Sequence, residues 1–310
     1  MARCGDPTGV SRRVILGTGL ALALLLSPAL ATAQEKSLAD RLMPLIRAHH
    51  GKVAVAVLHL DDGVTWDYDG DEPMPSASLI KFMVMLEVYQ QVAEGKIKLS
   101  DTVVLREADK VPGSGILTYH FSEGATFPLR DAVRLMIAFS DNTATNLVLD
   151  HIGIASTNRR MADWGFPNSR INAKVYRGET TSVDPARTKK YGLGSTTPRE
   201  TVRLLQKLYQ GKAGSKEHTK EMIDHLKKCE DKEKLKRFLP AGVVIAHKSG
   251  SISDAKTDAG ILYFEGGPVA LCVMTAQNED RRFHADNEAS IVIGRIAEQV
   301  YLHFMKAPKN

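Results

Sequence analysis

The sequence predicts an α+β fold in which a helical lobe is inserted into one antiparallel sheet. Two strand-like segments lie early, at 53–60 and 64–68, and three lie after residue 240. The segment between residue 96 and about residue 230 is mostly helical in pattern. The simplest architecture is a five-stranded antiparallel sheet flanked by the terminal helices, with the lobe between its second and third strands. A cleft between sheet and lobe is then the natural place for a functional site.

The strands are recognised by apolar, β-branched runs and by the turns that separate them. Val53 to Leu60 and Val64 to Tyr68 are joined by Asp61-Asp62-Gly63, a turn sequence typical of a hairpin. The last two late strands are separated by Gly266-Gly267. The three late strands are predicted at Val243 to His247, Ala259 to Phe264 and Val269 to Ala276.

The helices are recognised by apolar faces at helical spacing and by their end residues. Ser37 to His50 predicts the first helix, because Ser37 and Asp40 have the spacing of a capping box. Glu288 to Met305 predicts the last, an amphipathic helix. The helices expected inside the lobe, besides the one that follows Ser78, include Leu129 to Phe139, Asn142 to Ile152, Ser156 to Trp164 and Arg199 to Tyr209.

Residues 1–33 have the pattern of an export signal peptide. Arg12-Arg13 precede the apolar run Val14 to Leu26, and Ala31-Thr32-Ala33 supplies small residues for cleavage. A twin-arginine signal and an ordinary secretory signal both fit. The sequence therefore predicts a periplasmic or secreted protein. Its catalytic domain is expected at 34–310, with an α/β lobe of residues 34–74 and 235–310 and a helical lobe of about 75–234.

Composition narrows the possible partners. The formal net charge is +5, of which the leader contributes about two charges, and both signs are interspersed along the rest. We therefore expect neither nucleic-acid binding nor stable membrane insertion, and no oligomerisation pattern speaks against a monomer. No cysteine or histidine spacing indicates a metal, and no cofactor is expected. Cys229 and Cys272 fit either a disulfide or two free thiols, and His247 fits a packed strand residue.

The stretch Ser78-Leu79-Ile80-Lys81 stands at the start of an apolar helix that ends near Gly95. Three residues apart, the hydroxyl of Ser78 and the amine of Lys81 share a helix face, where the amine can take the hydroxyl proton. By itself the tetrapeptide also fits a helix cap followed by a solvated lysine, and Ser253-Asp254-Ala255-Lys256 has the same spacing.

Two further motifs favour the catalytic interpretation. Ser140-Asp141-Asn142 lies at a helix–helix junction, and Lys248-Ser249-Gly250 follows the predicted strand 243–247. S-x-x-K, S-D-N and K-[ST]-G in this order are the signature of penicillin-recognising serine enzymes. The chain resembles the class A serine β-lactamases over nearly its whole length after the leader.

The resemblance implies a role for each motif residue. Ser78 would attack the lactam carbonyl, Lys81 would accept its proton and Ser140 would relay a proton to the lactam nitrogen. The backbone N–H groups of Ser78 and Ser251 would form the oxyanion hole. Asn142 would bind the acylamide side chain of a small β-lactam, and Lys248 and Ser249 its carboxylate, while Gly250 lets the ligand approach. Asp141 is expected to be structural.

The sequence departs from the family in the segment between Arg170 and Pro198. Class A enzymes carry there a glutamate that serves in deacylation, and its position falls near Val175 in this chain. An insertion before Glu179 would place its carboxylate correctly and make it the deacylating base. The alternative is that Glu179 is a solvated acid in the loop. Asp184 is the other acid of the segment. Three functions therefore stay open: a β-lactamase, a related serine peptidase or esterase, and a penicillin-binding module that deacylates slowly.

Overall fold

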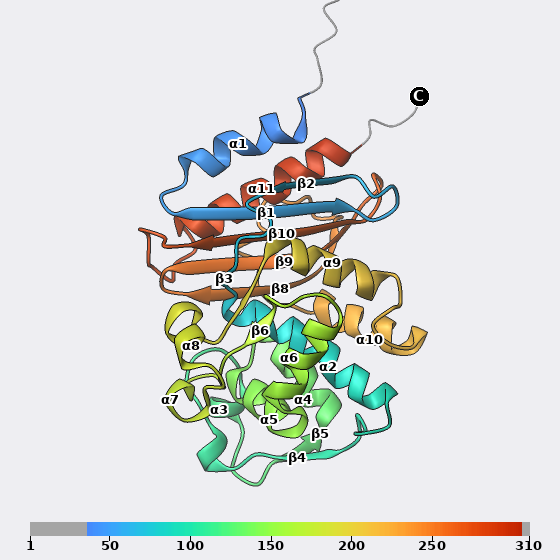
Figure 1. Ribbon diagram of the computed structural model, residues 1–310, viewed down its shortest axis with the longest axis vertical. Helices are drawn as coiled ribbons and strands as arrows, with labels where there is room; N and C mark the ends of the chain where they lie inside the picture. Colours follow the sequence, from blue (N-terminus) through green and yellow to red (C-terminus); the bar gives the residue numbers. More distant parts are fainter. Residues whose placement is uncertain (1–35, 306–310) are drawn as a thin grey trace, which may run out of the picture. The chain divides into compact units, whose positions relative to one another are not determined.

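The computed structural model describes residues 36–305, which belong to one compact unit. The predicted leader lies outside the described residues. The main sheet has five antiparallel strands in the order β2-β1-β10-β9-β8 (Figure 1). The predicted α+β class and the five-stranded sheet are confirmed. The strands are β1 (Lys52–His59), β2 (Thr65–Tyr68), β8 (Val244–Ile252), β9 (Ala255–Tyr263) and β10 (Val269–Ala276).

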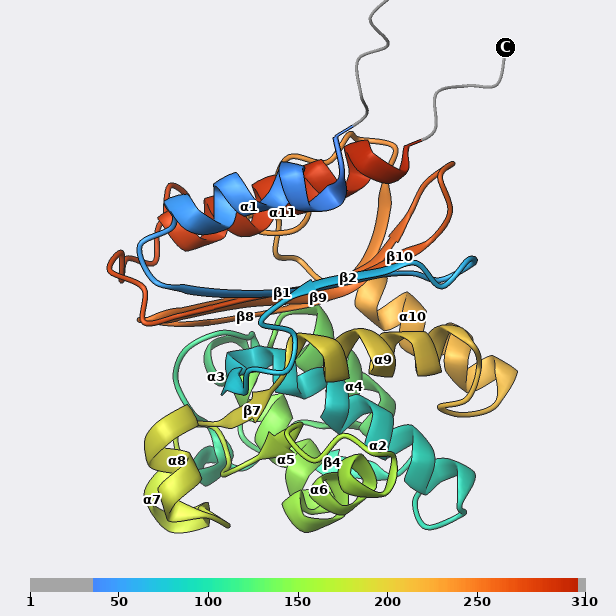
Figure 2. The ribbon, with the colours of Figure 1, turned by 45° about the horizontal axis from the view of Figure 1, so that its top comes forward.

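Successive side chains of a strand point to opposite faces of the sheet, so both faces present apolar residues. Helices cover each of these faces. On β1, Val53, Val55 and Val57 pack with α1 (Leu38–Ala48) and α11 (Glu288–Phe304) in one core. The alternating small residues Ala54 and Ala56 face the other core, which belongs to the helical lobe. Figure 2 shows α1 and α11 side by side on one face and the lobe on the other.

The helical lobe is built around α2 (Lys81–Ala93), whose residues are almost all buried. A helix that is apolar on every side belongs in the centre of a bundle, and α2 contacts α4, α5 and α6. Two small sheets, β4-β5 and β3-β7-β6, lie at the edges of the lobe. The surrounding helices are α3 (Leu117–His120), α4 (Leu129–Ala138), α5 (Asn142–Ile152), α6 (Ile154–Asp163), α9 (Pro198–Tyr209) and α10 (Lys216–Lys227).

The segment from Arg170 to Thr197 runs beside the lobe as an irregular loop with short elements. The small sheet strands β6 and β7 hold its two ends together, and β7 also pairs with β3. Its short helices and strands, with the remaining small strands, are β6 (Arg170–Ile171), α7 (Gly178–Thr181), α8 (Pro185–Tyr191), β7 (Gly194–Thr196), β3 (Met74–Pro75), β4 (Thr102–Val104) and β5 (Thr126–Pro128).

One predicted boundary is wrong in a way that matters for the site. Lys248-Ser249-Gly250 was expected to follow its strand, but β8 continues to Ile252 and contains all three residues. Pairing with β9 supplies backbone hydrogen bonds that local propensity does not reveal, with Lys248 opposite Ala259 and Gly250 opposite Thr257. Within residues 36–305, no helix is long and apolar enough to cross a membrane.

Candidate active site

Ser78 lies in a short 3-10 helix, η1 (Ala77–Ile80), directly before α2. The preceding residue, Ala77, has a positive φ of 44°, which is strained for a residue with a side chain. Strand β8 packs against this turn so closely that a Cβ on Gly250 would lie 2.7 Å from the backbone nitrogen of Ser78. Gly250 therefore makes room first for the turn that carries the predicted nucleophile.

Lys81 begins α2 and is completely buried among polar groups. Its Nζ donates to the carbonyl of Ser140 at 2.6 Å and to the side chain of Asn142 at 2.8 Å, and lies 3.2 Å from the Ser140 hydroxyl. In the described part of the chain no hydrogen bond joins Lys81 to Ser78. Burial, and then the charge of Lys248, lower the pKa of Lys81 well below its ordinary value, against the opposing charge of Asp141.

Ser140 is held at the junction of α4 and α5 in a left-handed conformation, with φ 53°. Its carbonyl accepts hydrogen bonds from Lys81 and from the hydroxyl of Ser114, the latter at 2.9 Å. Asp141 caps α5 through Ala144 and also accepts backbone hydrogen bonds from the 116–117 turn. Asp141 thus has the structural role that the sequence predicts, and it fixes the junction on two sides.

Lys248 reaches the same junction from the sheet. Its Nζ donates to the hydroxyl of Ser140 at 3.0 Å and to the carbonyl of Ser249 at 2.6 Å. Only 1% of Lys248 is exposed, and burial lowers its pKa, although Cys229, Asp231 and Asp258 oppose the shift. The three sequence motifs therefore meet at one hydroxyl, that of Ser140, which lies between two buried lysines.

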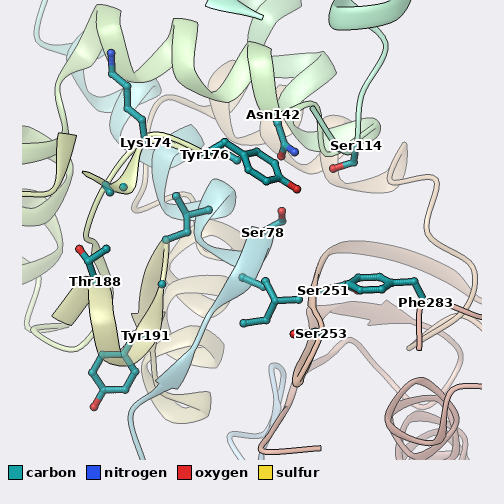
Figure 3. A pocket seen from close by; sticks show the side chains of 18 residues that line it. Ser78, Ser114, Asn142, Lys174, Tyr176, Thr188, Tyr191, Ser251, Ser253 and Phe283 are labelled. Carbon is teal, nitrogen blue, oxygen red and sulfur yellow. The ribbon is translucent and has the colours of Figure 1, made fainter. Parts of the chain in front are cut away.

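Ser78 opens into a cavity of about 720 Å³. Asn142 and Ser251 line the same cavity, on the lobe side and the sheet side respectively. Figure 3 shows the Ser78 side chain and the Tyr176 hydroxyl pointing into this shared space, with Ser251 and Phe283 across it. The structure therefore brings the predicted nucleophile and two predicted binding residues together. Lys248 and Ser249 line an adjoining hollow, which shares Ser114, Ser251 and Phe283 with the first.

The wall opposite the sheet comes from the loop 170–197, and Val175 lies in it. The Asn146 side chain donates to the carbonyl of Val175 at 3.0 Å and accepts from its N–H at 2.9 Å. These paired hydrogen bonds fix the backbone of Val175 beside the cavity. An isopropyl group consequently stands at the position where counting from Arg170 puts the family's glutamate.

Glu179 lies elsewhere. It is in α7, is exposed, and borders a different hollow with Tyr176, Arg177 and Thr188. Asn146 thus holds Val175, and not Glu179, at the cavity wall. Asp184 caps α8 through the N–H of Arg187 at 3.0 Å. No carboxylate is among the described residues that line the Ser78 cavity.

Sequence reasoning missed several residues of the cavity wall, Tyr176 and Phe283 among them. Tyr176 has a positive φ of 54° and is 66% exposed, unusual for so large an aromatic side chain. Asn146 does not line the cavity but holds Val175 there, and this pairing depends on the fold. Cys229 and Cys272 are both free thiols, which decides between the two alternatives left by the sequence. Within residues 36–305 no group of three or more acidic, cysteine or histidine side chains is placed to hold a metal ion.

This arrangement is that of a penicillin-recognising serine enzyme. The sequence model of the beta-lactamase enzyme family matches residues 37–304, so the chain belongs to that family. The CARB-3 β-lactamase of Pseudomonas aeruginosa is 26% identical over 257 residues, which is 81% of this chain and 85% of the relative. The Toho-1 β-lactamase of Escherichia coli is also 26% identical, over 87% of this chain and 91% of the relative.

Solved structures give the same fold. The β-lactamase of Sphaerobacter thermophilus has a TM-score of 0.76 at 29% identity, covering 87% of this chain and 99% of its own. PBP-A has a TM-score of 0.74 at 26% identity, and the match covers 87% of this chain and 96% of PBP-A. A leucine-to-glutamate mutant of PBP-A, with the same TM-score and identity, is an acyl-enzyme complex with penicillin G. The chain is thus a serine β-lactamase-like protein, as predicted.

Proposed function

We propose that Ser78 opens the ring of small β-lactams and forms an acyl-enzyme. The observation that carries this proposal is the buried Lys81, held by Ser140 and Asn142 next to the Ser78 cavity. Burial and the charge of Lys248 lower the pKa of Lys81, which favours the uncharged amine, the proton acceptor that a serine nucleophile requires. For this step the Lys81 amine exchanges its hydrogen bond with the Ser140 carbonyl for one with the Ser78 hydroxyl.

Ser140 passes the proton onward to the lactam nitrogen as the amide bond breaks. Its hydroxyl is already within hydrogen-bond range of Lys81 and Lys248, so a proton can move along this line of atoms. The developing negative charge on the carbonyl oxygen is held by the backbone N–H groups of Ser78 and Ser251. Removing such a donor costs about 3 kcal/mol of transition-state stabilisation.

The substrate's charged and amide groups bind on either side of this line. Lys248 and Ser249 take the carboxylate, because their hollow adjoins the Ser78 cavity. Asn142 takes the acylamide after exchanging its hydrogen bond with Lys81. We further propose that the chain acts as a monomer after export to the periplasm or the medium, since its first 33 residues have the pattern of a signal peptide.

Release of the acyl group is the slow half of the reaction. A general base contributes about 10²–10⁴-fold, and Val175 offers none. This favours a second candidate function, a penicillin-binding protein or a related peptidase or esterase whose acyl-enzyme with β-lactams is long-lived. The two functions share acylation and differ only in the lifetime of the ester.

Intact-protein mass measured over time with benzylpenicillin tests the proposal. We expect a stoichiometric adduct on Ser78 that decays over minutes to hours, with hydrolysed penicillin appearing at the same slow rate. Ser78→Ala removes the adduct, and Ser253→Ala, which changes the other S-x-x-K match, leaves it in place. An adduct that forms at full rate in Ser78→Ala contradicts the assignment of the nucleophile.

A further inference from the structure

A second nucleophilic side chain faces the groove near Lys248. Cys229 follows α10 and lines the hollow of about 550 Å³ that contains Ser140, Lys248 and Ser249. The thiol is 7% exposed, so it is recessed, but it is on the wall of an open hollow. None of the roles proposed above uses this thiol.

Cys229 belongs to a chain of three side chains. The imidazole of His247 on β8 lies 3.0 Å from a carboxylate oxygen of Asp258 on β9, through Nδ1. The thiol of Cys229 lies beside the same imidazole. His247 is 1% exposed and Asp258 is fully buried, and Asp258 also accepts the N–H of Leu235 at 3.1 Å. Thiol, imidazole and carboxylate in this order are the arrangement that activates a cysteine nucleophile.

The environment of Cys229 differs from that of the other described thiol. Burial alone raises the pKa of Cys229, but the charge of His247 and its hydrogen bond, with help from Lys248, lower it to about 7. Asp258 keeps His247 protonated by raising its pKa, against the effect of burial. Cys272 is completely buried in β10, and burial raises its pKa.

Cys229, His247 and Asp258 are not placed to hold a metal ion together. A purely structural ion pair between His247 and Asp258 does not require a thiol at position 229, nor one that faces an open hollow. The geometry of Cys229 is that of a reactive cysteine at the wall of an open hollow.

We propose that Cys229 is a modification site, a thiolate activated by His247 and Asp258 that reacts with small hydroperoxides entering the hollow beside Lys248. The sulfur attacks one oxygen of the peroxide, a sulfur–oxygen bond forms and the oxygen–oxygen bond breaks. The leaving hydroxide of hydrogen peroxide, or the leaving alkoxide of an organic hydroperoxide, takes the proton of the His247 imidazolium and becomes water or an alcohol. Sulfur is oxidised by two electrons to a sulfenic acid, and the peroxide is reduced by the same two.

Oxidation changes the subsite that Lys248 provides. It replaces a negative thiolate near the Lys248 ammonium by a neutral, larger group that hydrogen-bonds. We expect slower acylation of Ser78 by penicillins after oxidation, and this consequence alone rests on the function proposed above. Modification of the thiol itself is measured independently of any lactam.

The test exposes the folded full chain to hydrogen peroxide with dimedone, which traps sulfenic acids, and maps the labelled peptides. We expect dimedone on Cys229 and none on Cys272. Alkylation of native Cys229 by iodoacetamide should show an inflection near pH 7, so that about half the thiol is reactive there, against about 3% of an ordinary cysteine. The groups facing the thiol in this titration are His247, Lys248 and Asp258.

His247→Gln removes the positive partner, and the inflection should move above pH 8 with a roughly tenfold slower reaction at pH 7. After peroxide treatment, Cys229→Ser should be acylated as fast as the same variant without treatment. Acylation of the unchanged chain should become several-fold slower. If His247→Gln does not fold, the pH profile of the unchanged chain still decides. An inflection at or above pH 8.5, or dimedone on neither cysteine in the folded protein, overturns the proposal.

Discussion

The two sides of the site around Ser78 differ in how they are held. On one side, which we call the acylation wall, Ser140 and Lys248 line the hollow that adjoins the Ser78 cavity, and hydrogen bonds between the α4–α5 junction, Lys81 and strand β8 fix them. The other wall is a loop, in which a pair of hydrogen bonds from Asn146 holds an apolar residue, Val175. In the proposed function the first wall carries the motif residues that acylate, and the second has Val175 where the family's deacylating glutamate is expected. The proposed function therefore assigns formation and release of the acyl-enzyme to different walls, and substitutions on each wall can test the two steps separately.

The largest effect is expected on the acylation wall. Lys81→Met removes the amine but keeps the length of the buried side chain. We expect penicillin acylation of Ser78 to fall by about 10²–10⁴-fold, since the proton acceptor is lost. The measurement is the rate at which the intact mass shifts, and Lys174→Met is the control, a cavity-wall lysine whose side chain points away from Ser78 (Figure 3).

The pH profile of the unchanged chain sharpens this result. Because burial and Lys248 lower the pKa of Lys81, its amine loses its proton at a lower pH than the amine of a free lysine does. The acylation rate should rise with pH through that lowered pKa and then level off. A rate that keeps rising to pH 10 would contradict a lowered pKa for the group that accepts the proton.

The next effect is a gain on the loop wall. Val175→Glu places a carboxylate on the wall of the cavity, at a backbone position that Asn146 already fixes. Release of the penicilloyl group should accelerate by about 10²-fold or more, because an added base activates water. The decay of the adduct mass measures this, with Val175→Gln as a control of the same size and no charge. Equal decay in the two variants shows that the position does not reach the ester.

A smaller effect separates support of the wall from general stability. Asn146 and Asn158 make the same pair of hydrogen bonds, one to the backbone of Val175 and the other to the backbone of Ile171. Replacing either by alanine leaves buried backbone groups unpaired and should cost about 1–3 kcal/mol in the free energy of unfolding. Thermal unfolding should show similar losses, but only Asn146→Ala should alter the kinetics with penicillin. Kinetic changes of equal size in both variants would show that they come from lost stability and not from the position of Val175.

The acylation wall was predictable from sequence and the loop wall was not. Ser78, Ser140 and Lys248 belong to short motifs whose residue types are fixed by chemistry, and alternating or helical patterns place the elements around them. The position of Glu179 depends on the path of the loop from Arg170 to Thr197, and loop paths follow from tertiary contacts such as that of Asn146. The continuation of β8 through Lys248 was missed for a related reason, since pairing with β9 overrides the weak strand propensity of Lys-Ser-Gly.

The smallest effect is expected at Glu179. It is exposed on α7 and outside the Ser78 cavity, so Glu179→Gln should leave acylation and release within about twofold of the unchanged chain. Asp184→Asn is the companion variant in the same loop, which keeps a capping oxygen for α8. Both are compared by adduct decay with benzylpenicillin. A decay slowed tenfold or more in Glu179→Gln alone would mean that the loop closes over the acyl-enzyme and brings this carboxylate to the ester, and the loop wall would then supply a base by movement.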